Sequence, residues 1–85
     1  DLDAAADTVL RASVLATGQA CQSLERVYVH ESIHDAFVAK LAERARAVEI
    51  TWPDPAKGAV GPFIWARQAD VVAEQLADAV RKGAK

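Results

Sequence analysis

The sequence predicts an α/β fold built in the order helix–strand–helix–loop–helix. In three separate segments, apolar residues recur every three or four positions, which is the spacing of an amphipathic helix. One shorter segment alternates apolar and polar side chains instead, as a strand with one buried face does. All three prolines lie between residues 51 and 62, where they mark a long loop.

The first helix is predicted over residues 3–16, an alanine-rich segment. Its apolar positions are Val9, Leu10, Val14 and Leu15. Asp1 or Asp3 can cap the amino end, because a carboxylate accepts hydrogen bonds from the free backbone N–H groups there. Gly18 follows the last apolar position and is expected to stop the helix in a left-handed conformation.

A turn over residues 17–23 holds Cys21, and a strand is predicted directly after it, over residues 24–30. Alternation in this strand places Val27 and Val29 on the same face. One strand cannot satisfy its own backbone hydrogen bonds. We therefore expect the second strand to come from outside these 85 residues or from another copy of the chain, and we expect the chain to self-associate.

The second helix is predicted over residues 33–49, with Ser32 at the start of a capping box. Its apolar stripe consists of Ile33, Phe37, Leu41, Ala45 and Val48. An ordered loop over 51–62 comes next. The third helix is predicted over 64–82, and Gly83 is expected to end it.

Composition limits the possible functions. The chain has 85 residues and a formal net charge of −2, so there is no electrostatic reason to expect a nucleic acid or an anionic membrane as partner. No apolar run approaches the roughly 20 residues that a membrane-spanning helix needs. A single cysteine forms no internal disulfide and supplies no zinc cluster, so we expect a cytoplasmic protein without a metal site. The absence of methionine suggests a piece of something longer or a processed product.

Cys21 is the candidate nucleophile of this sequence. A thiolate attacks carbonyl carbon well, but the sequence demonstrates no neighbour that would activate the thiol. Two other interpretations stay open for Cys21. A lone thiol is most often a small buried hydrophobic group, and an exposed one can sense oxidants. His30 and His34 are expected to be surface residues near the junction of strand and helix rather than a base for Cys21.

The residues around Cys21 resemble the catalytic-cysteine segment of the aldehyde dehydrogenase superfamily. Gly18-Gln19-Ala20-Cys21 is similar to the nucleophile motif, and Arg26-Val27-Tyr28-Val29 to the strand that follows it. Further similar segments come in the family's order, namely 32–41, Asp54-Pro55, Gly61-Pro62 and 79–85. Their common register over 85 residues implies that the chain is a fragment of the family's α/β catalytic domain.

The resemblance also implies an activity. The Cys21 thiolate would attack an aldehyde to give a thiohemiacetal, hydride would pass to NAD or NADP, and water would release a carboxylate from the thioester. The backbone N–H of Cys21 would be one oxyanion donor. The family's second donor is an asparagine, which this sequence lacks, and its water-activating glutamate and cofactor-binding domain lie outside the matched residues. The isolated chain is therefore expected to be inactive, and, because its predicted strand has no internal partner, to form a homo-oligomer.

The chain departs from the family pattern at three places. Ala16 stands where many members have asparagine, and Pro53 replaces a common glycine. Gln22 and Ser23 follow the nucleophile where small residues are usual. Because those neighbours shape the aldehyde tunnel, this third departure bears on the choice of substrate.

An alternative from another functional class is a stand-alone oligomerising interaction module in which Cys21 belongs to the core. The two hypotheses differ in the accessibility of this side chain. A structural thiol is buried and inert, whereas a catalytic thiol can be reached and alkylated.

Overall fold

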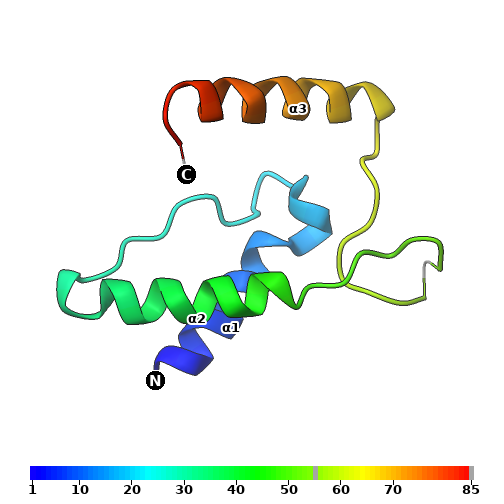
Figure 1. Ribbon diagram of the computed structural model, residues 1–85. Coiled ribbons are helices and arrows are strands. Elements are labelled where there is room, and N and C mark those ends of the chain that lie inside the picture. Colours follow the sequence, from blue (N-terminus) through cyan, green and yellow to red (C-terminus); the bar gives the residue numbers. More distant parts are fainter. Residues whose placement is uncertain (55, 85) are drawn as a thin grey trace.

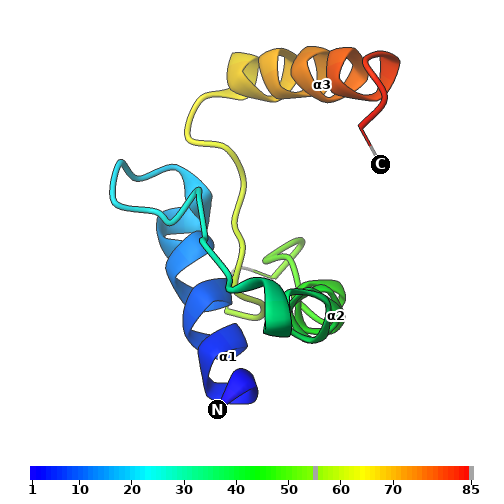
Figure 2. The same ribbon diagram turned by 90° about the vertical axis from the view of Figure 1, so that its left-hand side faces the viewer.

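The computed structural model describes residues 1–54 and 56–84. Within them the chain forms three α-helices, α1 (Leu2–Ser13), α2 (His34–Arg46) and α3 (Ala66–Arg81). Two short 3-10 helices, η1 (Leu15–Gly18) and η2 (Glu31–Ile33), follow α1 and precede α2. The helices α1 and α2 cross and pack together, whereas α3 lies apart from both at the end of an extended connection (Figure 1, Figure 2).

α1 begins at a carboxylate cap. Oδ1 of Asp1 accepts the backbone N–H groups of Asp3 at 2.9 Å and Ala4 at 3.2 Å. Two of the donors that a helix start leaves free are thereby satisfied. One turn further on, Ala6 is fully buried, and its small side chain allows α2 to approach the helix closely.

The carboxyl end of α1 comes earlier than predicted. The helix ends at Ser13, because Ala16 and Thr17 take φ angles of 49° and 59°, which an α-helix does not accommodate. Gly18 is left-handed as expected, with φ 74°, but it closes η1 and not the α-helix. The predicted range of 3–16 therefore extends past the end of α1 into η1, which contains the left-handed residues Ala16 and Thr17.

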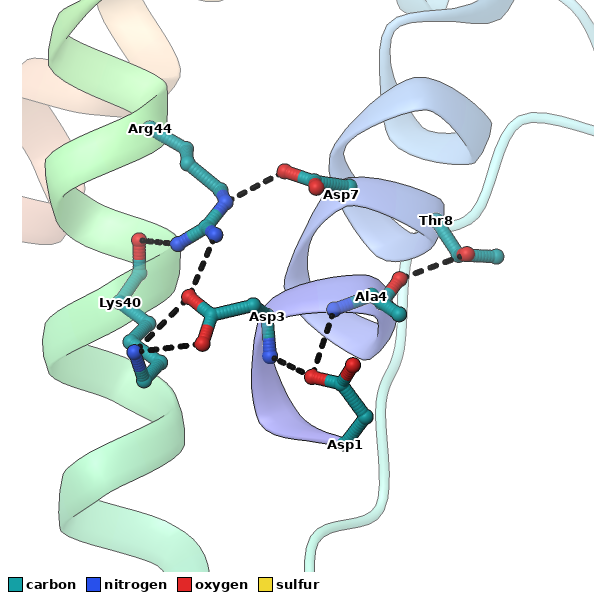
Figure 3. A network of polar contacts seen from close by, with 7 residues as sticks. All are labelled: Asp1, Asp3, Ala4, Asp7, Thr8, Lys40 and Arg44. Carbon is teal, nitrogen blue, oxygen red and sulfur yellow. Dashed lines mark hydrogen bonds and ion pairs between the residues drawn. The ribbon is translucent and has the colours of Figure 1, made fainter.

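Four charged side chains connect α1 to α2 (Figure 3). Lys40 Nζ and Arg44 Nη2 lie 2.8 Å and 2.7 Å from the same carboxylate oxygen of Asp3. Arg44 also donates a hydrogen bond through Nε to Asp7. Bonds from Lys40 and Arg44 hold the pKa of the Asp3 carboxyl below its ordinary value. Single exposed ion pairs contribute little to stability, but these four groups share partners and so form a network.

α2 starts behind a 3-10 turn and not at the predicted capping box. Nδ1 of His30 accepts the backbone N–H of Ser32 at 3.2 Å and lies 2.9 Å from the Ser32 hydroxyl. Since Ser32 is held by His30, it does not cap α2, and Ile33 precedes the helix without a side-chain cap. The helix ends at Arg46, so the predicted range of 33–49 is too long at the carboxyl end.

The hydrophobic core is small. Among the described residues, the buried apolar side chains are Ala6 on α1 and Phe37 on α2. Large apolar side chains remain exposed elsewhere, including Tyr28, Trp52, Ile64, Trp65, Leu76 and Val80. The chain thus stabilises itself mainly where α1 meets α2.

The predicted strand over residues 24–30 is not confirmed. In the described residues the structure is helical and contains no strand, so the α/β class is not confirmed either. The physical reason is that a strand exists through hydrogen bonds to a neighbouring strand, and this segment has none beside it. Its start is fixed instead by the N–H of Leu24, which donates to the Ala12 carbonyl of α1 at 3.0 Å.

The loop over 51–62 folds back on the segment that follows α2. The N–H of Thr51 donates to the carbonyl of Val60 at 2.8 Å. Gly58, with φ 84°, allows this close return, because a Cβ there would lie only 2.7 Å from the Glu49 carbonyl oxygen. Pro55 of the predicted Asp54-Pro55 pair and Lys85 at the end of the 79–85 match lie outside the described residues.

α3 lies within the predicted 64–82 and ends in a Schellman motif. The N–H of Ala84 donates to the Ala79 carbonyl and that of Gly83 to the Val80 carbonyl, each at 3.0 Å. Gly83 takes the left-handed φ of 94° that this motif requires. None of the helices in the described residues is long and apolar enough to cross a membrane.

The lowered pKa of the Asp3 carboxyl predicts that the stability of the fold depends on pH. Its pKa is lower in the folded chain than in the unfolded chain, where an aspartate has a pKa of about 3.9. Its ion pairs therefore stabilise the fold fully above that value and lose their effect as the pH falls through the lower folded pKa. We expect the thermal midpoint, followed by far-UV circular dichroism, to decrease from about pH 5 to about pH 2.

The variant Asp3→Asn should lower the midpoint at neutral pH and flatten this dependence. Asp70→Asn, which changes an exposed aspartate of α3, is the matched control and should follow the unsubstituted chain. Equal slopes for Asp3→Asn and the unsubstituted chain would contradict the assignment.

Candidate functional site around Cys21

Cys21 lies in the turn directly after η1, and its side chain is exposed and free. The N–H of Ser23 donates to the Ala20 carbonyl at 2.9 Å and closes this turn. The thiol donates to the side-chain oxygen of Gln22, 3.3 Å away, and Gln22 is itself exposed. A small molecule in solution can therefore reach the sulfur.

The residues after Cys21 are fastened to the end of α1. Ser23 is buried, with 7% of its surface exposed, and its hydroxyl donates to the Leu15 carbonyl at 2.8 Å. The next residue, Leu24, is bonded to Ala12 as described above. The sequence singled out Ser23 only as an unusual neighbour of the nucleophile, and its hydroxyl proves to be a structural anchor.

A strained turn precedes Cys21. Three consecutive residues, Ala16, Thr17 and Gly18, have positive φ angles of 49°, 59° and 74°. Glycine adopts this conformation freely, but a residue with a Cβ is disfavoured there by roughly 1–2 kcal/mol. The turn that presents Cys21 therefore needs contacts that hold it in place.

The side chain of Gln19 holds this turn through contacts to residues that are far away in the sequence. Its Nε2 donates to the Thr17 hydroxyl and to the Pro62 carbonyl, the latter at 3.1 Å. Its Oε1 accepts the backbone N–H of Ile64 at 2.9 Å. The motif around Cys21 included Gln19, but no sequence pattern could reveal partners that lie 43 and 45 residues away.

The two histidines are engaged within their own segments. His30 contacts Ser32, and Nδ1 of His34 lies 2.9 Å from a carboxylate oxygen of Asp35. In the part of the chain that the structure describes, no group of three or more His, Cys, Asp or Glu residues is placed to hold a metal ion. The site thus consists of an accessible thiol on a turn with fixed flanks, and such a thiol can attack a carbonyl carbon or undergo oxidation.

Comparison with known proteins shows the family to which the chain belongs. The model of the aldehyde dehydrogenase family matches residues 1–85. The chain belongs to this family.

The curated relatives are much longer than the chain. It is 38% identical over 85 residues to 3-sulfolactaldehyde dehydrogenase of Priestia aryabhattai, with 100% of this chain and 18% of that protein covered. It is 42% identical over 85 residues to succinate-semialdehyde dehydrogenase (NADP+) of Mycolicibacterium paratuberculosis, with 99% of this chain and 18% of that protein covered. The chain thus spans 18% of the length of these aldehyde dehydrogenases. No solved structure matches it significantly.

The left-handed turn predicts a stabilising substitution at Ala16, which is one of the positions where the chain departs from the aldehyde dehydrogenase pattern. Ala16 is exposed and has a φ of 49°. Asparagine tolerates the left-handed region better than alanine does. We expect Ala16→Asn to stabilise the chain by up to about 1 kcal/mol in denaturant unfolding.

The same position provides the matched control. Ala16→Val places a β-branched residue at the same φ and should destabilise the chain, because branching at Cβ makes the left-handed region least accessible. If both substitutions destabilise the chain equally, the conformation of Ala16 is not the cause.

Proposed function

We propose that Cys21 is the catalytic nucleophile of an NAD(P)-dependent aldehyde dehydrogenase and that this chain is the part of the catalytic domain that presents it. The observation that supports this most directly is a free, exposed thiol at the end of Gly18-Gln19-Ala20-Cys21, in a chain that matches the family over its whole length. Two relatives named as aldehyde dehydrogenases, at 38% and 42% identity, support an aldehyde as the substrate class.

Cys21 would act by forming a carbon–sulfur bond to the aldehyde. Its thiol first loses a proton to solvent or a base, and the resulting thiolate attacks the carbonyl carbon, so that the C=O π electrons move to the carbonyl oxygen as a negative charge. A backbone N–H placed at that oxygen stabilises the charge, and the N–H of Cys21 itself is the donor that this chain supplies. The product of this step is a thiohemiacetal on Cys21.

The described residues do not fit a dinucleotide site. Their glycines, at positions 18, 58, 61 and 83, are scattered and form no glycine-rich loop between a strand and a helix. In the family reaction NAD or NADP accepts a hydride, and we assign its binding to parts of the parent protein other than this chain. The same parts would supply the asparagine and glutamate that complete the site.

Two further features belong to this proposal. In the parent domain, residues 24–30 would pair with neighbouring strands, which is supported by their extended course and their unpaired position in Figure 1. A cytoplasmic location agrees with the single, unpaired cysteine.

The exposure of Cys21 argues against the alternative of an interaction module with a structural thiol. A structural thiol would lie in the core, but the buried apolar residues among those described are Ala6 and Phe37. A redox-sensing thiol would also be exposed. The family match favours catalysis over sensing, because it extends along the whole chain and not only around the thiol.

The nucleophile assignment predicts the effect of removing the thiol. In the full-length enzyme that contains this chain, Cys21→Ala should lower NAD(P)-dependent aldehyde oxidation by about 10³-fold or more, because the proposed covalent intermediate forms on the Cys21 sulfur. Gln75→Ala, on the exposed face of α3, is the control and should keep full activity. The isolated 85-residue chain should show no turnover but should be alkylated at Cys21 by iodoacetamide under native conditions. Turnover that survives Cys21→Ala would exclude the proposed role.

We also propose that the chain self-associates into a homo-oligomer. The support is that no strand lies beside residues 24–30 in the part of the chain that the structure describes, together with exposed apolar side chains on α3, among them Leu76 and Val80. Sedimentation over a series of concentrations should therefore show dimers or larger species of the isolated chain.

Substitutions to lysine identify the surface through which the chain self-associates. Val27→Lys should weaken association if it proceeds by strand pairing, and Leu76→Lys if it proceeds through α3. A monomer at all concentrations would contradict the proposed self-association.

A further inference from the structure

Gln19 joins two segments that are far apart in the sequence. Its side-chain amide donates to the Pro62 carbonyl at 3.1 Å and accepts the Ile64 N–H at 2.9 Å, so it pairs with the backbone on both sides of Phe63 as a peptide group would. We call this pair of hydrogen bonds the Gln19 bridge. It fastens the turn before Cys21 to the segment that leads into α3.

A second contact brings the same two segments together. A Cβ added at Gly61 would lie 3.3 Å from Cγ2 of Thr17, which is closer than most real side chains approach. The backbone at Gly61 is therefore packed against the left-handed turn, one residue before the Gln19 bridge begins at Pro62. The two contacts are independent, since one is steric and the other consists of hydrogen bonds.

The Gln19 bridge also reaches the strained part of the turn. The second N–H of the Gln19 amide donates to the Thr17 hydroxyl, and Thr17 has a φ of 59°. A residue with a Cβ persists in this conformation only where its surroundings hold it. Gln19 thus connects the strained turn, the segment 62–64 and, two residues further along the chain, the nucleophile.

We propose that Gln19 is a positioning residue for Cys21. The inference rests on the proposed function and deepens it. Gln19 does not contact the Cys21 sulfur; it fixes the backbone from which the thiol and the backbone N–H of Cys21 project. Without the bridge, Ala16 and Thr17 can leave their left-handed conformation. The sulfur and the backbone N–H of Cys21 then move relative to the aldehyde. A displacement of about 1 Å in such a group can lower the rate by about a hundredfold.

The test uses Gln19→Met in the full-length enzyme. Methionine nearly preserves the length and volume of the side chain but removes the amide groups that form the bridge. We expect kcat to fall by about ten- to hundredfold while KM for the aldehyde stays within about twofold, because the reacting groups are misplaced and the binding surface is not altered. Gln75→Met is the matched control and should retain the original kcat and KM.

A second variant tests the two halves of the bridge separately. Gln19→Glu keeps an oxygen that accepts the Ile64 N–H, but its ionised carboxylate cannot donate to the Pro62 carbonyl. Its kcat should therefore lie between those of Gln19→Met and the unsubstituted enzyme. This ordering is expected only if the hydrogen bonds, and not the bulk of the side chain, position Cys21.

The outcomes separate a positioning role from a structural one and from failure of the proposed function. Active sites are counted by iodoacetamide labelling of Cys21, and folding is followed by the thermal midpoint. If Gln19→Met and Gln19→Glu lower the midpoint but keep the original kcat per labelled site, Gln19 is merely structural and the inference is overturned. If Cys21→Ala is inactive and both Gln19 variants have the original kcat, only this inference fails. If Cys21→Ala remains active, the proposed function fails, and the positioning role falls with it.

Discussion

Ala6 and Phe37, the buried apolar side chains of the described residues, lie on the two helices that pack together. Around this contact, Asp3 and Asp7 of α1 meet Lys40 and Arg44 of α2. The packing of α2 against α1 fixes the position of α1, and the turn that presents Cys21 is bonded to the end of α1. Ser23 and Leu24 are bonded to the stretch from Ala12 to Leu15, so a shift of α1 would move the turn that presents Cys21.

The remainder of the molecule has few contacts to stabilise it. Within residues 1–54 and 56–84 no strand lies beside residues 24–30, and α3 presents Leu76 and Val80 to solvent. Backbone groups and apolar surfaces of this kind are stable in a larger domain, where other elements cover them. This agrees with a chain that spans 18% of the length of its curated relatives.

The helices could be predicted from sequence because apolar spacing and end signals are local properties. Gly83 illustrates this, since its left-handed φ of 94° ends α3 close to the predicted position. Features that depend on other parts of the molecule could not be predicted. The strand over 24–30 is not confirmed, because alternation describes a strand's faces and not whether a partner strand exists. The contacts of Gln19 could not be predicted because Pro62 and Ile64 are distant in sequence. Cys21 stood out only through the resemblance of its surroundings to a known family, since a lone thiol has no diagnostic spacing.

The arrangement around Cys21 separates the groups that hold the turn from the group proposed to react. Before the nucleophile, Gln19 binds the segment 62–64, and after it, Ser23 binds the first residue of η1, Leu15. Both anchors act on the backbone flanks, while the thiol contacts only the exposed side chain of Gln22 among the hydrogen bonds described. A nucleophile that forms and breaks a covalent bond in each cycle must change the surroundings of its sulfur. Because the flanks do not depend on the sulfur, the thiol can change partners while the N–H that would stabilise the oxyanion stays in place.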